Sequence, residues 1–191
     1  STPRQNAQQV MSFAQNCGIA PSHIIYDATA GRYFNDYIPE AIPYLSATKP
    51  IGLYAYTAAT TKDLCYLRLV RMINDGNISF SETVANKTYT HQNLKFRVTV
   101  QNEFLEECAV VRFSTLLNGR QRLLTKKQMN ATLGRGRSMD LLDPCAMRMR
   151  PCVEMEYGRE LEYGFQSADE NRYEERYTGV QQTIYDDTLW Y

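Results

Sequence analysis

Apolar residues recur at helical or strand spacing in several short segments, which polar turns, glycines and prolines separate. A spacing near 3.6 residues predicts one helix over residues 3–17 and another that begins at Thr60 or Thr61 and ends at Asp75. Continuous apolar runs predict strands at residues 23–27 and 51–56. Between these strands, Pro39 and Pro43 bracket a predicted loop or short turn of helix.

The second half of the chain continues this alternation. A helix is predicted over residues 94–108, followed by a hairpin whose strands, 110–115 and 121–125, flank an Asn-Gly turn. A last helix is predicted over residues 139–148, and Pro144 fits its first turn if the helix begins late. Helices that alternate with strands place the chain in the α/β class.

Charge divides the chain into two parts. Of its 191 residues, positions 1–150 carry 18 Lys and Arg against 11 Asp and Glu, whereas positions 151–191 carry 3 against 10. We therefore expect a folded domain over 1–150 and an acidic tail over 151–191, whose six tyrosines can order against a partner or the domain itself. No apolar run approaches the roughly 18–20 residues of a membrane span, so we expect a soluble protein without membrane partners.

Three carboxylates are candidates for chemistry. Asp27 ends a predicted strand, at the sheet edge where α/β proteins bind ligands, although it also suits a cap for the next turn. Asp140 and Asp143 are three residues apart on one helical face behind Ser138, a candidate N-cap, although acids there also complement the helix dipole. Clustered carboxylates repel unless a cation neutralises them, and oxygen ligands favour Mg²⁺ or Mn²⁺.

A basic stretch precedes the two helical acids, because no Asp or Glu occurs between Glu107 and Asp140. A solvated surface hairpin normally mixes charge signs, whereas a run of cations is typical of a surface that binds nucleic-acid phosphates. The predicted DNA-binding residues are Arg112, Arg120, Arg122, Lys126, Lys127, Arg135 and Arg137.

Several of these segments resemble one family in the order in which they occur. The run Ser138-Met139-Asp140-Leu141-Leu142-Asp143-Pro144 is similar to the Ser-Pro-Asp-x-x-Asp-Ala motif in the nuclease domain of the large terminase subunit of tailed bacteriophages. Residues 24–31, which contain Asp27, resemble the central strand of that domain. The segment from Thr61-Lys62 to residue 78, residues 102–106 and the hairpin that ends at Lys126-Lys127 follow in the family's order, so that the resemblance covers about residues 5–150.

This resemblance implies an RNase H-like fold, a mixed sheet flanked by helices. It implies hydrolysis of DNA phosphodiesters by two Mg²⁺ or Mn²⁺ ions, which cuts concatemeric phage DNA in the host cytoplasm during packaging. Asp27 and Asp140 would hold metal, and Asp143 would be a further or alternative ligand. The implied partners are double-stranded DNA, the portal and the small terminase subunit.

The chain also departs from the family. Met139 and Pro144 replace the proline and the small residue of the motif, and residues 1–22 contain no acid where the family has its first metal-binding Asp. We therefore expect the opening strands to be missing or supplied from elsewhere, and this chain alone to cut slowly or not at all. No GxxxxGK[ST] loop for a packaging ATPase is present. A non-enzymatic phage assembly or DNA-binding module, and a cellular RNase H-like resolvase, remain alternatives.

Overall fold

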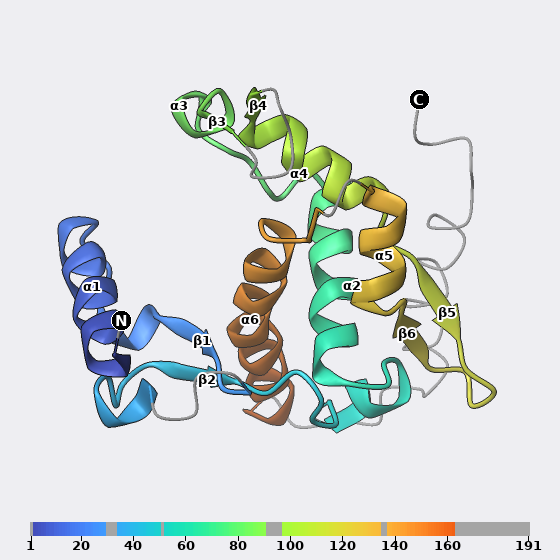
Figure 1. Ribbon diagram of the computed structural model, residues 1–191. Coiled ribbons are helices and arrows are strands. Elements are labelled where there is room, and N and C mark those ends of the chain that lie inside the picture. Colours follow the sequence, from blue (N-terminus) through green and yellow to red (C-terminus); the bar gives the residue numbers. More distant parts are fainter. Residues whose placement is uncertain (1, 30–33, 51, 91–96, 135–136, 163–191) are drawn as a thin grey trace.

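The computed structural model describes residues 2–29, 34–50, 52–90, 97–134 and 137–162, so the predicted acidic tail lies mostly outside the described residues. The fold is mixed α/β (Figure 1). Its helices are α1 (Pro3–Asn16), α2 (Thr61–Asn74), α3 (Glu82–Ala85), α4 (Val100–Ala109), α5 (Lys126–Leu133) and α6 (Leu142–Glu162). Single 3₁₀ turns occur at Pro21–His23, Phe34–Asp36 and Gly52–Tyr56.

The described strands form three separate sheets of two strands each. Strand β1 (Ile25–Asp27) pairs in parallel with β2 (Ile42–Tyr44). The other two pairs are antiparallel: β3 (Thr88–Thr90) with β4 (Arg97–Thr99), and β5 (Phe113–Thr115) with β6 (Gln121–Leu123). The mixed α/β class predicted from the sequence is therefore confirmed, while the described strands do not join into one larger sheet.

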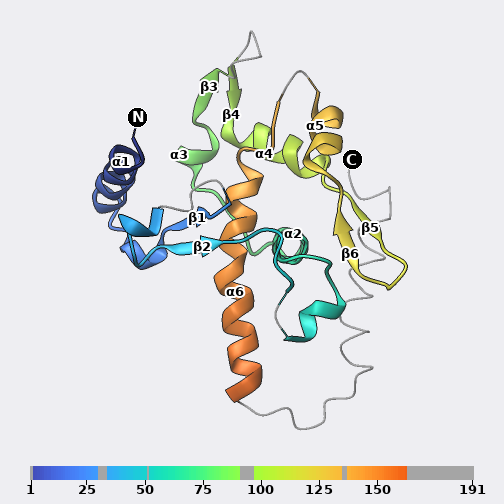
Figure 2. The same cartoon turned by 60° about the horizontal axis from the view of Figure 1, so that its bottom comes forward.

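The main core lies where α2 packs against α6, in the middle of the molecule (Figures 1 and 2). Helix α2 begins at its N-cap Thr60, whose hydroxyl accepts the backbone N–H of Asp63. It buries Tyr66 and Leu69 against Leu142 and other apolar residues of α6, and α4, α5 and the β5–β6 hairpin close the same cluster. This core holds in place the first turns of α2, α5 and α6, which carry the polar residues described below.

Helix α1 lies at one edge of the molecule, beyond the β1–β2 pair (Figure 1). Its buried alanines, Ala7 and Ala14, are small enough for the helix to approach its neighbours closely. Ala7 shares a small apolar cluster with Ile38 and Ala41, to which Tyr26 of β1 also packs. The N-terminal part of the chain thus has a second, smaller core of its own.

The predicted first helix, the helix over 61–74 and the hairpin about Asn118-Gly119 are confirmed. The strand predicted at 51–56 is wrong: this segment is a 3₁₀ turn, and Gly52 has a left-handed φ of +53°, which a strand does not accommodate. The partner of β1 is instead β2, around Pro43. Proline is tolerated there because it lies in a short strand at the edge of a sheet.

Two helices have other bounds than predicted. Helix α4 begins at Val100, because the β-branched residues before it belong to strand β4. Helix α6 begins only at Leu142, which places Pro144 in its first turn, and it continues through Pro151 across the predicted domain boundary. Val153, beyond that boundary, packs against Ala58 and Leu64. Among the described residues, no helix is long and apolar enough to cross a membrane.

Candidate functional site

Side chains from the first turns of α2 and α5 reach the carboxylate of Asp143, which lies in the first turn of α6. Lys126, the first residue of α5, places its Nζ 2.7 Å from Oδ2, and Lys62, in the first turn of α2, places its Nζ 3.3 Å from Oδ1. The hydroxyl of Tyr66 donates a short hydrogen bond to Oδ1. The Lys62 ammonium also lies 5.4 Å from the centre of the Tyr66 ring. We refer to these four residues as the Asp143 cluster.

The Asp143 cluster holds its carboxylate in the ionised form. Burial raises the pKa of Asp143, but the hydrogen bonds from Lys126 and Tyr66 and the charge of Lys62 outweigh burial and bring the pKa below its usual range. Burial also disfavours the charged form of Lys126 and lowers its pKa. The hydrogen bond and the charge of Asp143 outweigh this effect, so that the pKa of Lys126 is raised. Two lysines around one aspartate leave the cluster with one positive charge in excess, at the surface of the protein.

A second polar cluster lies between α4 and the segment before α6. The guanidinium of Arg137 is buried and contacts Glu103 through two pairs of atoms, Nε to Oε1 at 3.1 Å and Nη2 to Oε2 at 2.7 Å. A short contact joins the same guanidinium to Glu106. Because the paired Glu103 is also buried, this is an internal ion pair that fastens residues 137–141 to α4.

Glu107 caps the N-terminus of α6 from α4. Its carboxylate accepts the backbone N–H groups of Leu141 and Leu142, at 3.1 Å and 2.7 Å to Oε2. Burial, with smaller contributions from the charges of Glu103 and Asp140, raises the pKa of Glu107 to about 7, against the lowering effect of these two hydrogen bonds. The N-cap predicted at Ser138 is therefore wrong, because α6 starts later and a side chain from another helix satisfies its first N–H groups.

The two remaining candidate acids, Asp27 and Asp140, are both exposed. Asp27 ends β1 as predicted, and its Oδ1 accepts the backbone N–H of Thr29 at 2.9 Å, which is the turn-capping arrangement left open above. Asp140 lies just before α6, where its charge acts on Lys126 and Glu107. Of the three predicted site acids, Asp140 and Asp143 thus share one helix terminus with cations.

The acids predicted to hold Mg²⁺ or Mn²⁺ do not fit a two-metal centre in the part of the chain that the structure describes. Both carboxylate oxygens of Asp143 are engaged by the lysines and Tyr66. Within the described ranges, no three Asp, Glu, His or Cys side chains gather as a metal-ligating group. Because a divalent cation needs several oxygen donors at once, the metal-binding roles of Asp27, Asp140 and Asp143 remain predictions from the sequence.

The residues of the predicted DNA-binding stretch have different environments. Arg122 and Lys127 are exposed, and Arg120 is half-buried at the hairpin. Arg112 is exposed, but its Nη1 donates to the backbone carbonyls of Ala109 and Val111 at 2.9 Å and 2.8 Å. Lys126 is exposed and pairs with Asp143. Arg137 is buried with Glu103, which excludes it from the surface in this structure, and Arg135 lies outside the described residues.

Sequence reasoning did not single out Lys62, Tyr66, Glu103 or Glu107 as site residues. One signal for the two glutamates is their spacing of four residues on the apolar face of α4, where each directly precedes a buried apolar residue, Phe104 or Cys108. Charged residues on a buried helical face are rarely left without partners, so such a pair predicts internal ion pairs or caps. No comparable local signal identifies Lys62 or Tyr66, whose common partner is distant in the sequence.

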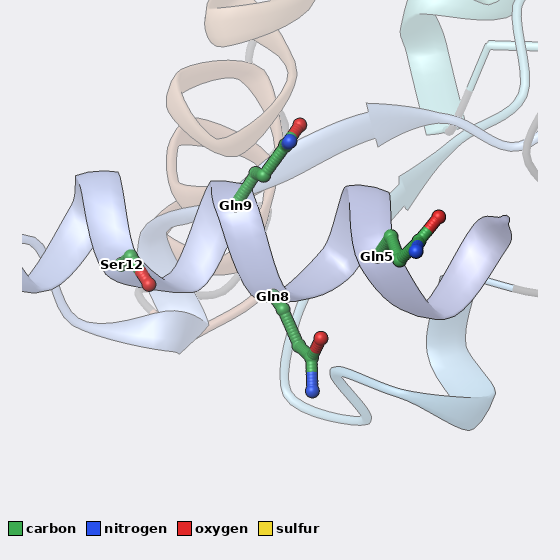
Figure 3. Close-up of a pocket in the computed structure, with 4 residues that line it drawn as sticks. All are labelled: Gln5, Gln8, Gln9 and Ser12. Atoms are coloured by element: carbon green, nitrogen blue, oxygen red, sulfur yellow. The ribbon is translucent and has the colours of Figure 1, made fainter. Parts of the chain in front are cut away.

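A shallow pocket of about 540 Å³ lies along α1 (Figure 3). The described residues that line it are Gln5, Gln8, Gln9 and Ser12, all from this one helix. Neutral amides and a hydroxyl offer hydrogen bonds but no nucleophile, acid or base. We therefore locate the candidate chemistry at the Asp143 cluster and at the exposed cations of β6 and α5, Arg122 and Lys127, rather than at this pocket.

Comparison with models of known protein families, with curated proteins and with solved structures gave no match.

Proposed function

We propose that the chain acts in viral genome packaging as an RNase H-like domain of a terminase large subunit, and that in this role it binds the phosphate backbone of duplex DNA. One observation carries the proposal. The segments that begin with Thr61-Lys62, end with Lys126-Lys127 and contain Asp143 each resemble the family separately, and they meet in space at the Asp143 cluster. The parallel pair β1–β2, which ends in Asp27, is also compatible with part of a mixed RNase H-like sheet.

The DNA-binding surface consists of Arg122 on β6, Lys127 on α5 and the excess positive charge of the Asp143 cluster. The chain carries no Asp or Glu from residue 108 to residue 139, so no acidic side chain on β6 or α5 opposes a polyanion. Such contacts position the protein on DNA without reading its sequence. The portal and the small terminase subunit belong to this proposal as protein partners, and the host cytoplasm as its location.

Binding to duplex DNA should weaken steeply with salt, because each phosphate contact releases counterions and adds about −0.9 to the slope of log K against log salt concentration. We expect the double substitution Arg122→Ala and Lys127→Ala to reduce the magnitude of this slope by about 1.8 and to weaken all sequences alike. Fluorescence anisotropy with a labelled duplex measures both effects. Lys87→Ala, at an exposed lysine before β3, is the matched control and should leave the slope unchanged.

Metal-dependent cleavage of DNA is the second candidate function. What favours it is that the exposed Asp140 and the ionised Asp143 lie three residues apart beside the basic surface. A divalent cation there requires donors beyond those that the described residues assemble.

Nicking of supercoiled plasmid in the presence of Mn²⁺ tests this second candidate. If Asp140 and Asp143 hold metal, Asp140→Asn and Asp143→Asn abolish nicking, while Asp36→Asn, at an exposed aspartate in the 3₁₀ turn before β2, retains it. If Asp143 instead only neutralises the two lysines, Asp143→Asn releases them and tightens DNA binding. Nicking that persists in both variants contradicts the cleavage proposal and leaves DNA binding standing.

A further inference from the structure

The tip of the β5–β6 hairpin presents a leucine to solvent. Leu117 is fully exposed, whereas the apolar residues of the hairpin strands, Phe113 and Leu123, are buried in the core. The turn is well defined: the N–H of Gly119 donates to the carbonyl of Leu116 at 2.9 Å, and the N–H of Leu116 donates to the carbonyl of Arg120 at 2.8 Å. Gly119 has the left-handed φ of +79° that a three-residue hairpin loop requires.

The base of this hairpin is fastened to the body of the protein. The backbone of Gln121 donates to the carbonyl of Thr57 at 2.8 Å and accepts the N–H of Ala59 at 3.0 Å, so segment 57–59 covers the outer edge of β6. The N–H of Leu123 donates to the buried carboxylate of Asp63 at 2.9 Å. The hairpin therefore projects from a braced base, and its tip points away from α2 and α6 (Figures 1 and 2).

Cations accompany this exposed leucine. Arg120 directly follows the loop, and Arg122 lies on the exposed side of β6, opposite Ser114. The stretch without acids, residues 108–139, includes the whole hairpin, so its charge is positive throughout. An apolar tip beside arginines is complementary to a duplex, which offers an apolar stack of bases next to rows of phosphates.

We propose that Leu117 is a wedge that enters the minor groove of duplex DNA and separates two stacked base pairs, while Arg120 and Arg122 contact the flanking phosphates. Proteins that kink DNA combine an apolar wedge with arginines or lysines in this way. The inference rests on the proposed DNA-binding function and adds to it that the bound duplex is locally unstacked. Flexible base steps, such as TA, are the preferred positions because they cost least to unstack.

A duplex with 2-aminopurine at a central TA step tests the wedge, because this base fluoresces weakly when stacked and strongly when unstacked. We expect the full chain to raise the fluorescence at saturation. Leu117→Ala should abolish the rise and weaken binding by about tenfold, which corresponds to 1.4 kcal/mol, with an unchanged salt slope because no phosphate contact is lost. Leu105→Ala, at an exposed leucine on α4, should change neither quantity.

The possible outcomes separate the two proposals. If the chain binds DNA in a salt-dependent way but does not raise the 2-aminopurine fluorescence, the wedge proposal is overturned and the proposed DNA binding stands. The same holds if the Leu117→Ala variant raises the fluorescence as much as the unchanged protein. Absence of salt-dependent binding overturns both. Arg122→Ala should flatten the salt slope yet retain the rise at saturating protein, because it removes a phosphate contact and not the wedge. Binding of the chain to vesicles of anionic lipid that depends on Leu117, without any rise on DNA, overturns the proposal in favour of membrane insertion.

Discussion

Replacing Arg137 with alanine should lower the free energy of unfolding by about 3–5 kcal/mol. The guanidinium is the partner of Glu103, and both side chains are more than nine-tenths buried. Its removal leaves a carboxylate uncompensated in the core, and that desolvation penalty, rather than the lost attraction, accounts for most of the cost. Urea denaturation followed by circular dichroism measures the change as a shift of the midpoint.

Two further variants show whether the buried charge is the cause. Arg122→Ala removes an exposed arginine and should change the free energy of unfolding by no more than about 0.5 kcal/mol. The double substitution Glu103→Met and Arg137→Met removes both charges at similar volume, and should recover most of the stability lost in Arg137→Ala. A loss below about 1 kcal/mol in Arg137→Ala would mean that Glu103 is solvated or has another partner.

Elements whose signals are local could be predicted from the sequence. Helix α2 has the predicted bounds because a Thr cap precedes it, its apolar residues repeat at helical spacing and Asp75-Gly76 follow it. The β5–β6 hairpin follows from strand alternation around Asn-Gly. Helix α5 also has a local signal, the capping box formed by Thr125 and Gln128, but this stretch is not among the helices predicted from the sequence.

Elements that depend on distant partners could not be predicted in this way. The apolar run at 51–56 has the composition of a strand, yet β1 pairs with β2 around Pro43, a residue that disfavours strands. Side-chain packing thus decided against local propensity. The three two-stranded sheets likewise reflect pairing choices that hydrophobic periodicity alone does not encode.

The candidate site was predictable only in part for the same reason. The basic stretch and the acids at the start of α6 are contiguous in the sequence, so their proximity could be expected. That Lys62 reaches Asp143, and that Arg137 turns inward to Glu103, follows from how α2 and α4 pack on α6. The sequence does not distinguish an arginine on the surface, such as Arg122, from one in an internal ion pair, such as Arg137, because only the packing of the helices decides which is buried.

Glu107 should make the protein less stable as the pH rises from about 4.5 to above 7. Its pKa is about 7 in the folded chain, against an ordinary value of 4.5, so in this interval the unfolded chain gives up the proton first. The folded state therefore binds more protons, and the free energy of unfolding falls with rising pH until both states are ionised. A separation of roughly 2.5 pH units corresponds to a loss of about 3 kcal/mol.

Asp143 acts in the opposite direction and in a different interval. Its pKa is lowered in the folded chain, so its contribution is present above the ordinary value of 3.8 and is lost only as the pH falls below it. Urea titrations between pH 4.5 and 8.5 therefore separate the contribution of Glu107 from that of Asp143.

We expect Glu107→Gln to remove most of the fall in stability between pH 5 and 8, because its amide oxygen still accepts an N–H at the start of α6 but does not titrate. Glu82→Gln, at an exposed glutamate in the first turn of α3, should retain the full pH dependence. If Glu107→Gln also retained it, the group that titrates near neutral pH would lie elsewhere, and the cap on α6 would be ionised throughout this range.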